Sequence, residues 1–107
     1  MDVNLALEES QPGLAEHLAV AIRKENLCTR TMRTYQHWIS QYLAYFDLKN
    51  PRRLSGGNAK EFLNHLVRRM SLSRAKLNQA REALVFLYEK VLDQPMVARE
   101  LAPIPSK

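Results

Sequence analysis

Basic residues are concentrated between positions 68 and 81, in the sequence RRMSLSRAKLNQAR. Its five basic side chains, with no acidic one among them, are Arg68, Arg69, Arg74, Lys76 and Arg81. Helix surfaces that meet only water usually mix both signs of charge, so this stretch indicates a polyanionic partner. Arg, Asn and Gln side chains can also form paired hydrogen bonds with base edges in the major groove of DNA. The stretch therefore favours nucleic-acid binding.

The charge of the whole chain is divided unevenly between its two ends. The formal net charge is +5. Residues 1–28 hold two basic and five acidic residues, a net charge of −3, whereas residues 29–107 hold 14 basic and six acidic residues, a net charge of +8. This asymmetry concentrates positive potential on one part of the surface and again favours a polyanion as the partner.

Length and composition predict one small helical domain. The chain has 107 residues, of which 46% are hydrophobic and 25% are charged, the usual balance of a globular protein. Three glycines supply few hairpin turns, and no apolar run approaches the roughly 18 residues that a membrane span needs. The first residues, MDVNLALEESQPG, lack the basic and apolar blocks of a secretory signal, so we expect a cytoplasmic protein.

No residue pattern in the chain indicates a metal, a cofactor or a catalytic centre. The single cysteine, Cys28, cannot form an internal disulfide. The histidines, His17, His37 and His65, lack the grouping of metal ligands. We therefore expect no cofactor and no metal, and a small enzyme has no catalytic constellation to support it.

Four stretches repeat apolar residues at helical spacing. The first helix is expected from Pro12 to about Lys24, and the second begins at Thr29 or Arg30 and ends near Phe46. Their expected buried residues are Leu14, Leu18, Ala21 and Ile22 in the first, and Tyr35, Trp38, Ile39, Tyr42, Leu43 and Phe46 in the second.

The third helix is expected to begin at Asn58, which forms a capping-box pattern with Glu61, and the fourth at Ser71 or Ser73. Their expected buried residues are Ala59, Phe62, Leu63, Leu66 and Val67 in the third, and Leu77, Ala80, Leu84, Leu87, Tyr88, Val91 and Leu92 in the fourth, which Pro95 should end. We expect an all-α, compact four-helix bundle over residues 12–94, a flexible segment over 1–11 and a linker over 95–107.

Two expected helix starts share the same chemistry. On the second helix, the outer face or the first turns hold Thr29, Arg30, Thr31, Arg33, Thr34 and His37. Around and after the fourth helix start lie Ser73, Arg74, Lys76, Asn78, Gln79 and Arg81. Hydroxyl groups, free backbone N–H groups and cations at a helix start can bind phosphate oxygens, so both sets are predicted DNA-binding residues. The alternative is a solvated basic face whose hydroxyl groups only cap the helices.

Phe86 lies about 200° from the buried stripe of the fourth helix, which predicts an exposed ring in an isolated four-helix domain. Either the tail or the first helix covers it, or it contacts another domain or protomer. A second functional hypothesis follows: a protein-interaction bundle whose basic face and Phe86 bind an acidic partner.

The segment from Leu14 to Val91 resembles the N-terminal, SAM-like core-binding domain of tyrosine recombinases, and is most similar to integron integrases. The resemblance lies in TRTMRTYQHWISQYLAYF, NAKEFLNHLV and LSRAKLNQAREALVFLYEKVL. The matching positions are Thr29, Arg30, Thr31, Tyr35, Trp38, Ile39 and Tyr42, then Gln79, Ala80, Ala83, Leu84, Phe86, Leu87, Tyr88, Lys90, Val91 and Leu92.

The resemblance implies a domain of an integron or phage integrase that clamps one face of double-stranded DNA at a recombination site. It also implies a C-terminal catalytic domain of the same parent chain, other recombinase protomers in a synaptic complex, and a DNA-associated location in a bacterium or phage. Because that catalytic domain is absent here, the isolated domain is not expected to be an enzyme. His65 and Arg68 have the H-x-x-R spacing of the catalytic domain, but they fall in an expected bundle helix and are not assigned a catalytic role.

Overall fold

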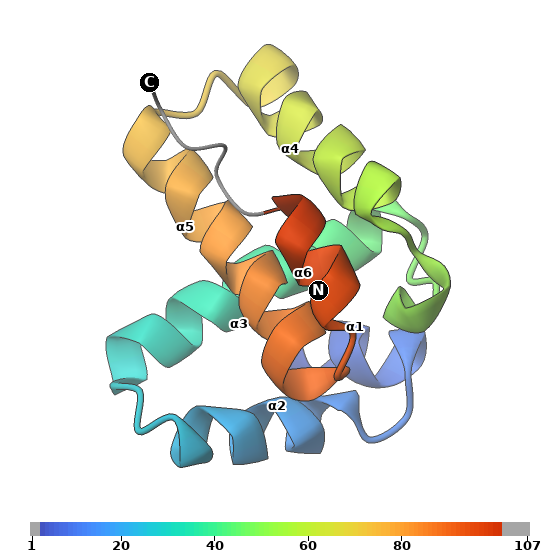
Figure 1. The fold of residues 1–107 in the computed structure, drawn as a ribbon, viewed down its shortest axis with the longest axis vertical. Helices are drawn as coiled ribbons and strands as arrows, with labels where there is room; N and C mark the ends of the chain where they lie inside the picture. The colour runs from blue at the N-terminus through green and yellow to red at the C-terminus, as the bar shows by residue number, and fades with distance from the viewer. Residues whose placement is uncertain (1–2, 102–107) are drawn as a thin grey trace.

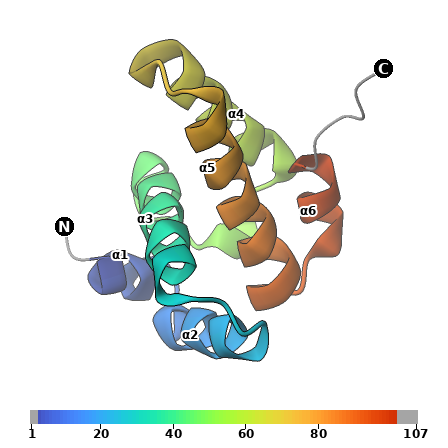
Figure 2. The same ribbon diagram turned by 90° about the vertical axis from the view of Figure 1, so that its left-hand side faces the viewer.

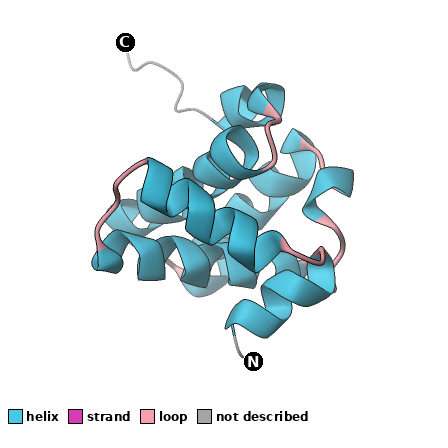
Figure 3. Ribbon diagram, turned by 90° about the horizontal axis from the view of Figure 1, so that it is seen from below, coloured by secondary structure: helices cyan, strands magenta, loops and turns pink. Residues whose placement is uncertain are grey.

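The computed structural model describes residues 3–101, and every regular element in this range is helical (Figures 1 and 3). The α-helices are α1 (Val3–Ser10), α2 (Leu14–Lys24), α3 (Thr29–Tyr45), α4 (Gly56–Met70), α5 (Arg74–Phe86) and α6 (Pro95–Leu101). A short 3₁₀ helix, η1 (Pro51–Arg53), precedes α4, and a π-helical turn, η2 (Leu87–Val91), continues α5. The all-α prediction is confirmed, and two short helices join the four expected ones.

Helix α5 occupies the centre of the fold. It crosses α3 on one side and contacts α4 and α6 on others, while α1 packs against α3, and α2 packs against α1 and η2 (Figures 1 and 2). Leu18, Ile39 and Leu84, from three different helices, are fully buried in one shared core. In residues 3–101, no helix is both long enough and apolar enough to span a membrane.

Most residues of the predicted buried stripes are buried, and one is exposed. Five of them are only partly buried against the core: Tyr35, Phe46, Leu63, Leu77 and Val91. All four expected residues of α2 are buried, as are Trp38, Ile39, Tyr42 and Leu43 on α3. On α4 the stripe ends at Leu66, and the expected burial of Val67 is wrong because its side chain is 47% exposed. Val67 follows Leu66 by one position, and the resulting 100° rotation turns it away from the core.

Helix α4 begins earlier than the sequence predicts. Ser55 is its N-cap, and the Ser55 hydroxyl accepts a hydrogen bond from the Asn58 backbone N–H at 3.3 Å. The Asn58 side chain accepts in turn from the Ser55 backbone N–H at 2.9 Å. Asn58 therefore occupies the third helical position, N3, of this capping box, and Ser55 is the cap. Gly56 and Gly57 lie in the first turn of the helix, instead of in the preceding loop.

The two chain ends also differ from the expectation. Residues 3–10 of the segment expected to be flexible form α1, whose Leu7 is fully buried. Residues 95–101 of the expected linker form α6, whose Leu101 is buried against the core. Proline is favoured in the first turn of a helix, so Pro95 begins α6 as well as ending the helix before it. Residues 1–2 and 102–107 lie outside the described range.

Candidate nucleic-acid interface

Helix α3 begins in the manner expected for an anion-binding helix end. Its N-cap is Cys28, in extended conformation, and no side-chain hydrogen bond caps the first turn. The first turn holds no acidic residue, and Thr29 and Arg30 are exposed. Free N–H groups and the positive end of the helix dipole favour an external anion at this position.

The Cys28 thiol is exposed and lies 3.3 Å from the Thr31 hydroxyl. Its hydrogen bond with Thr31 lowers the pKa of the thiol. Because this contact occupies the Thr31 hydroxyl, Thr31 is less available to an external phosphate than Thr29, whose side chain points into solvent.

Helix α5 begins with a different arrangement. Ser73 is the N-cap, and its hydroxyl accepts a hydrogen bond from the Lys76 backbone N–H at 3.3 Å. Arg74 and Lys76 are exposed in the first turn, which also lacks acidic residues. Ser73 therefore caps the helix. The side chains of Arg74 and Lys76 remain in solvent.

The two helices bring part of the predicted site together. Their starts lie on the same side of the molecule, at the left of Figure 1 and toward the viewer in Figure 2. Between them is a shallow cleft of about 300 Å³, which we call the α3–α5 cleft. It is lined by Arg33, Thr34, His37 and Trp38 of α3 and by Lys76 and Gln79 of α5. Five predicted DNA-binding residues thus share one concave surface.

Other predicted residues lie outside this cleft. Asn78 and Arg81 line a neighbouring groove of about 480 Å³, and the Arg81 guanidinium donates a hydrogen bond to the Asn78 side-chain oxygen at 2.6 Å. This contact uses one of the two lone pairs of the Asn78 amide oxygen, so one lone pair and two N–H donors remain for an external partner. The predicted residues that are exposed and line neither cleft nor groove are Thr29, Arg30, Ser73 and Arg74.

The predicted exposure of Phe86 is wrong. Phe86 is only 8% exposed, and its ring centroid lies 5.1 Å from that of Tyr35 on α3. The prediction assumed that this helix buries only one face. It is wrong because α5 has neighbours on more than one side, and α3 covers the face that carries Phe86. The two rings belong to the groove that also holds Val85 and Arg81. Burial raises the pKa of Tyr35, with Glu82 adding to the effect.

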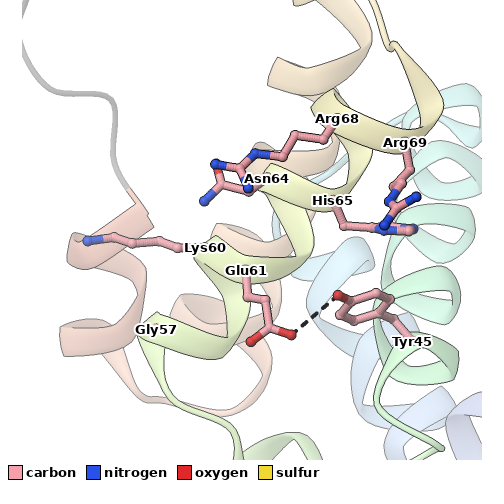
Figure 4. A pocket seen from close by; sticks show the side chains of 8 residues that line it. All are labelled: Tyr45, Gly57, Lys60, Glu61, Asn64, His65, Arg68 and Arg69. Carbon is pink, nitrogen blue, oxygen red and sulfur yellow. Dashed lines mark hydrogen bonds between the residues drawn. The ribbon is translucent and has the colours of Figure 1, made fainter.

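A second basic surface lies on α4. Its Arg68 and Arg69 belong to the basic stretch of residues 68–81, but no residue of α4 was among the predicted DNA-binding residues. Its side chains are Lys60, Glu61, Asn64, His65, Arg68 and Arg69, with Tyr45 from the end of α3 (Figure 4). We call it the α4 outer face. The repetition of Lys60, Asn64 and Arg68 at every fourth position is the sequence signal that could have identified it.

Few cations are neutralised within the described part of the chain. Among its described side chains, the ion pairs are those of Lys90 with Glu25 at 3.6 Å and with Glu89 at 3.9 Å. The cations of the α3–α5 cleft, Arg33 and Lys76, are therefore without a carboxylate partner there. Such a surface attracts polyanions at long range.

Comparisons with known proteins identify the family of the chain. The family described as phage integrase, N-terminal SAM-like domain, matches residues 14–97. Two proteins named "Integrase/recombinase", from Escherichia coli and from Pseudomonas aeruginosa, are each 30% identical to the chain over 94 residues. These residues cover 86% of the chain and 28% of each relative, so the chain spans just over a quarter of their length. No solved structure shows a significant match.

Proposed function

The chain belongs to the family of phage integrase N-terminal SAM-like domains, and we propose that it binds double-stranded DNA as the core-binding domain of a site-specific tyrosine recombinase. The α3–α5 cleft carries this proposal. Its two cations, its hydroxyl and its amide come from two helices that cross, so one duplex can reach both sets of side chains at once.

In this proposal the cations supply affinity and the amides supply selectivity. Arg33 and Lys76 bind phosphate groups from within the cleft, and Arg30 and Arg74 extend the contact at the two helix starts. Gln79 is the cleft residue suited to a base edge, because its amide both donates and accepts a hydrogen bond. Arg81 and Asn78 would act as a connected pair from the edge of the neighbouring groove.

The rest of the recombination reaction is assigned to other components. We propose that a C-terminal catalytic domain of the parent recombinase closes over the opposite face of the DNA, and that further protomers complete a synaptic complex. The motifs of α3 and α5 favour the integron branch of the family. An interdomain or interprotomer contact by Phe86 would use the small exposed part of its ring, beside Tyr35 and Val85.

The structure does not favour the rival hypothesis, in which Phe86 anchors the binding of an acidic protein. An anchor residue must insert into a partner, whereas the Phe86 ring already packs on Tyr35 in its own domain. What remains of that hypothesis is the basic face alone.

The test is a titration of fluorescently labelled duplex DNA at roughly 50 mM and 200 mM salt. Replacing both cations of the cleft, Arg33→Gln with Lys76→Gln, should lower the slope of log affinity against log salt by about 2, because two phosphate contacts are lost. The charge-matched control is Lys49→Gln with Arg53→Gln, two exposed residues of the loop before α4. Equal effects of the two pairs would show that net charge, not the cleft, determines binding.

A further inference from the structure

The α4 outer face presents a regular row of hydrogen-bond donors. Lys60, Asn64 and Arg68 follow one another at intervals of four residues, and all three are exposed. They lie on the side of α4 opposite to its buried residues, Ala59 and Phe62. The row extends about 12 Å along the helix axis, since each residue advances 1.5 Å.

The one carboxylate on this face, Glu61, is directed away from the row. It accepts a hydrogen bond from the Tyr45 hydroxyl at 3.3 Å, whereas Lys60 and Arg68 extend toward the other side of the helix (Figure 4). The Tyr45 ring also lies 4.7 Å from the His65 ring. Arg68 and Arg69 have no carboxylate within ion-pair distance among the described side chains. The α4 outer face is therefore mainly cationic, and its one carboxylate, Glu61, is hydrogen-bonded to Tyr45.

The chemistry of the lining favours a nucleic-acid backbone over an acidic protein. Protein interfaces usually centre on an apolar or aromatic anchor that inserts into the partner. The rings on this face, Tyr45 and His65, instead lie 4.7 Å apart and pack on each other, and the lining includes no aliphatic side chain. Phosphate binding needs only donors and positive charge. A row of about 12 Å spans roughly four successive phosphates of one strand, which are spaced about 3.4 Å along the axis of a DNA duplex.

We propose that the α4 outer face binds the sugar–phosphate backbone of a nucleic acid at a site separate from the α3–α5 cleft. Tyr45 is the residue through which α3 contributes to this face, and it lies twelve positions after Arg33, about 18 Å farther along the helix. The domain then carries two phosphate-binding surfaces and can hold two segments of nucleic acid. This inference does not depend on the role proposed for the cleft.

The test uses Arg68→Gln with Arg69→Gln, both in the natural sequence and together with Arg33→Gln and Lys76→Gln. Affinity for a labelled mixed-sequence duplex is measured by anisotropy at roughly 50 mM and 200 mM salt. In the background that lacks the cleft cations, where the α4 outer face is the remaining site, we expect binding at the lower salt to weaken about tenfold and the salt slope to fall by about 2. In the natural sequence, where the cleft is intact, we expect the number of duplexes bound per chain to fall. The loop pair Lys49→Gln with Arg53→Gln, which removes the same charge elsewhere, should have less than half of this effect.

A second variant adds one negative charge at the centre of the face. Asn64→Asp adds a carboxylate to an exposed helix position and should weaken duplex binding without changing the circular dichroism spectrum. The proposal is overturned if the Arg68 and Arg69 pair behaves like the loop pair. It is equally overturned if a labelled polyglutamate peptide binds in an Arg68-dependent manner while the duplex does not. Loss of binding in the α4 pair alone, with none in the cleft pair, would instead contradict the function proposed for the cleft.

Discussion

The hydroxyl oxygens of Tyr42 and Tyr88 lie 2.7 Å apart in the core, on residues 46 positions apart in the chain. The Tyr88 hydroxyl donates to the Pro51 carbonyl at 2.9 Å, so its single hydrogen is used there and Tyr42 must be the donor to Tyr88. This chain of hydrogen bonds joins α3, the 3₁₀ turn η1 and η2. The Arg52 side chain adds a bond to the Leu92 carbonyl at 3.0 Å. Together they fix the loop between α3 and α4.

Replacing Tyr88 by Phe should destabilise the fold by about 1–3 kcal/mol, because the buried Tyr42 hydroxyl loses its partner and the Pro51 carbonyl keeps only the Leu54 backbone N–H. Urea unfolding measures the change. The matched control is Tyr45→Phe, at an exposed hydroxyl, which should stay within about 0.5 kcal/mol of the natural sequence. Equal losses in the two variants would contradict a structural role for the buried pair.

The same pair predicts sensitivity to alkali. Burial raises the pKa of Tyr88 to about 12 and also raises the pKa of Tyr42, whereas an unfolded tyrosine titrates near 10. The folded protein holds these protons more tightly, so their contribution to stability is complete below about pH 10 and is lost as the pH rises toward 12.

Each buried tyrosine should contribute a slope of about −1.4 kcal/mol per pH unit in this interval. Urea unfolding of the natural sequence and of a Tyr42→Phe, Tyr88→Phe double variant measures the difference. The double variant should be less stable at neutral pH but should lose stability less steeply above about pH 10. Parallel curves would show that the pair does not titrate on unfolding.

The capping box of α4 predicts a further stability effect. Ser55→Ala removes the acceptor for the Asn58 backbone N–H and should cost about 1 kcal/mol. Asn64→Ala, an exposed change in the same helix, serves as control and should not destabilise, because alanine has the higher helix propensity. If thermal unfolding placed both variants at the same stability, Ser55 would not be the functional cap.

The sequence predicts the four long helices because the 3.6-residue spacing of their buried side chains depends on local geometry alone. It misplaces the start of α4 because Gly56 and Gly57 resemble a loop, although the first turn tolerates glycine there. It misses α6 because Pro95 can begin a helix as well as end one. The first error concerns a helix end and the second a whole short helix, and in both cases one or two residues decide between alternatives.

The site is predicted less completely than the helices. Helical geometry finds the cationic starts of α3 and α5, but the crossing of these helices decides that Arg33 and Lys76 share a cleft while Arg81 lines another groove. The burial of Phe86 likewise depends on Tyr35 from a distant part of the chain. Tertiary packing of this kind is not encoded in the periodicity of any one helix.

Cys28 provides a probe of the proposed contact, because its exposed thiol immediately precedes Thr29. The hydrogen bond with Thr31 lowers the thiol pKa, so alkylation by iodoacetamide should proceed readily in the folded protein. A bound duplex should slow this reaction several-fold by covering the start of α3. Mass spectrometry measures the rate, and an unchanged rate at saturating duplex would place the DNA elsewhere.

We propose that the starts of α3 and α5 bind one duplex together. Amide chemical shifts of the isotope-labelled 107-residue chain, recorded while a short duplex is added at low salt, test it most directly. We expect the amides of residues 29–37 and 73–79 to shift along a single titration curve. Shifts confined to one of these segments, or found only on α2 and α6, would contradict it.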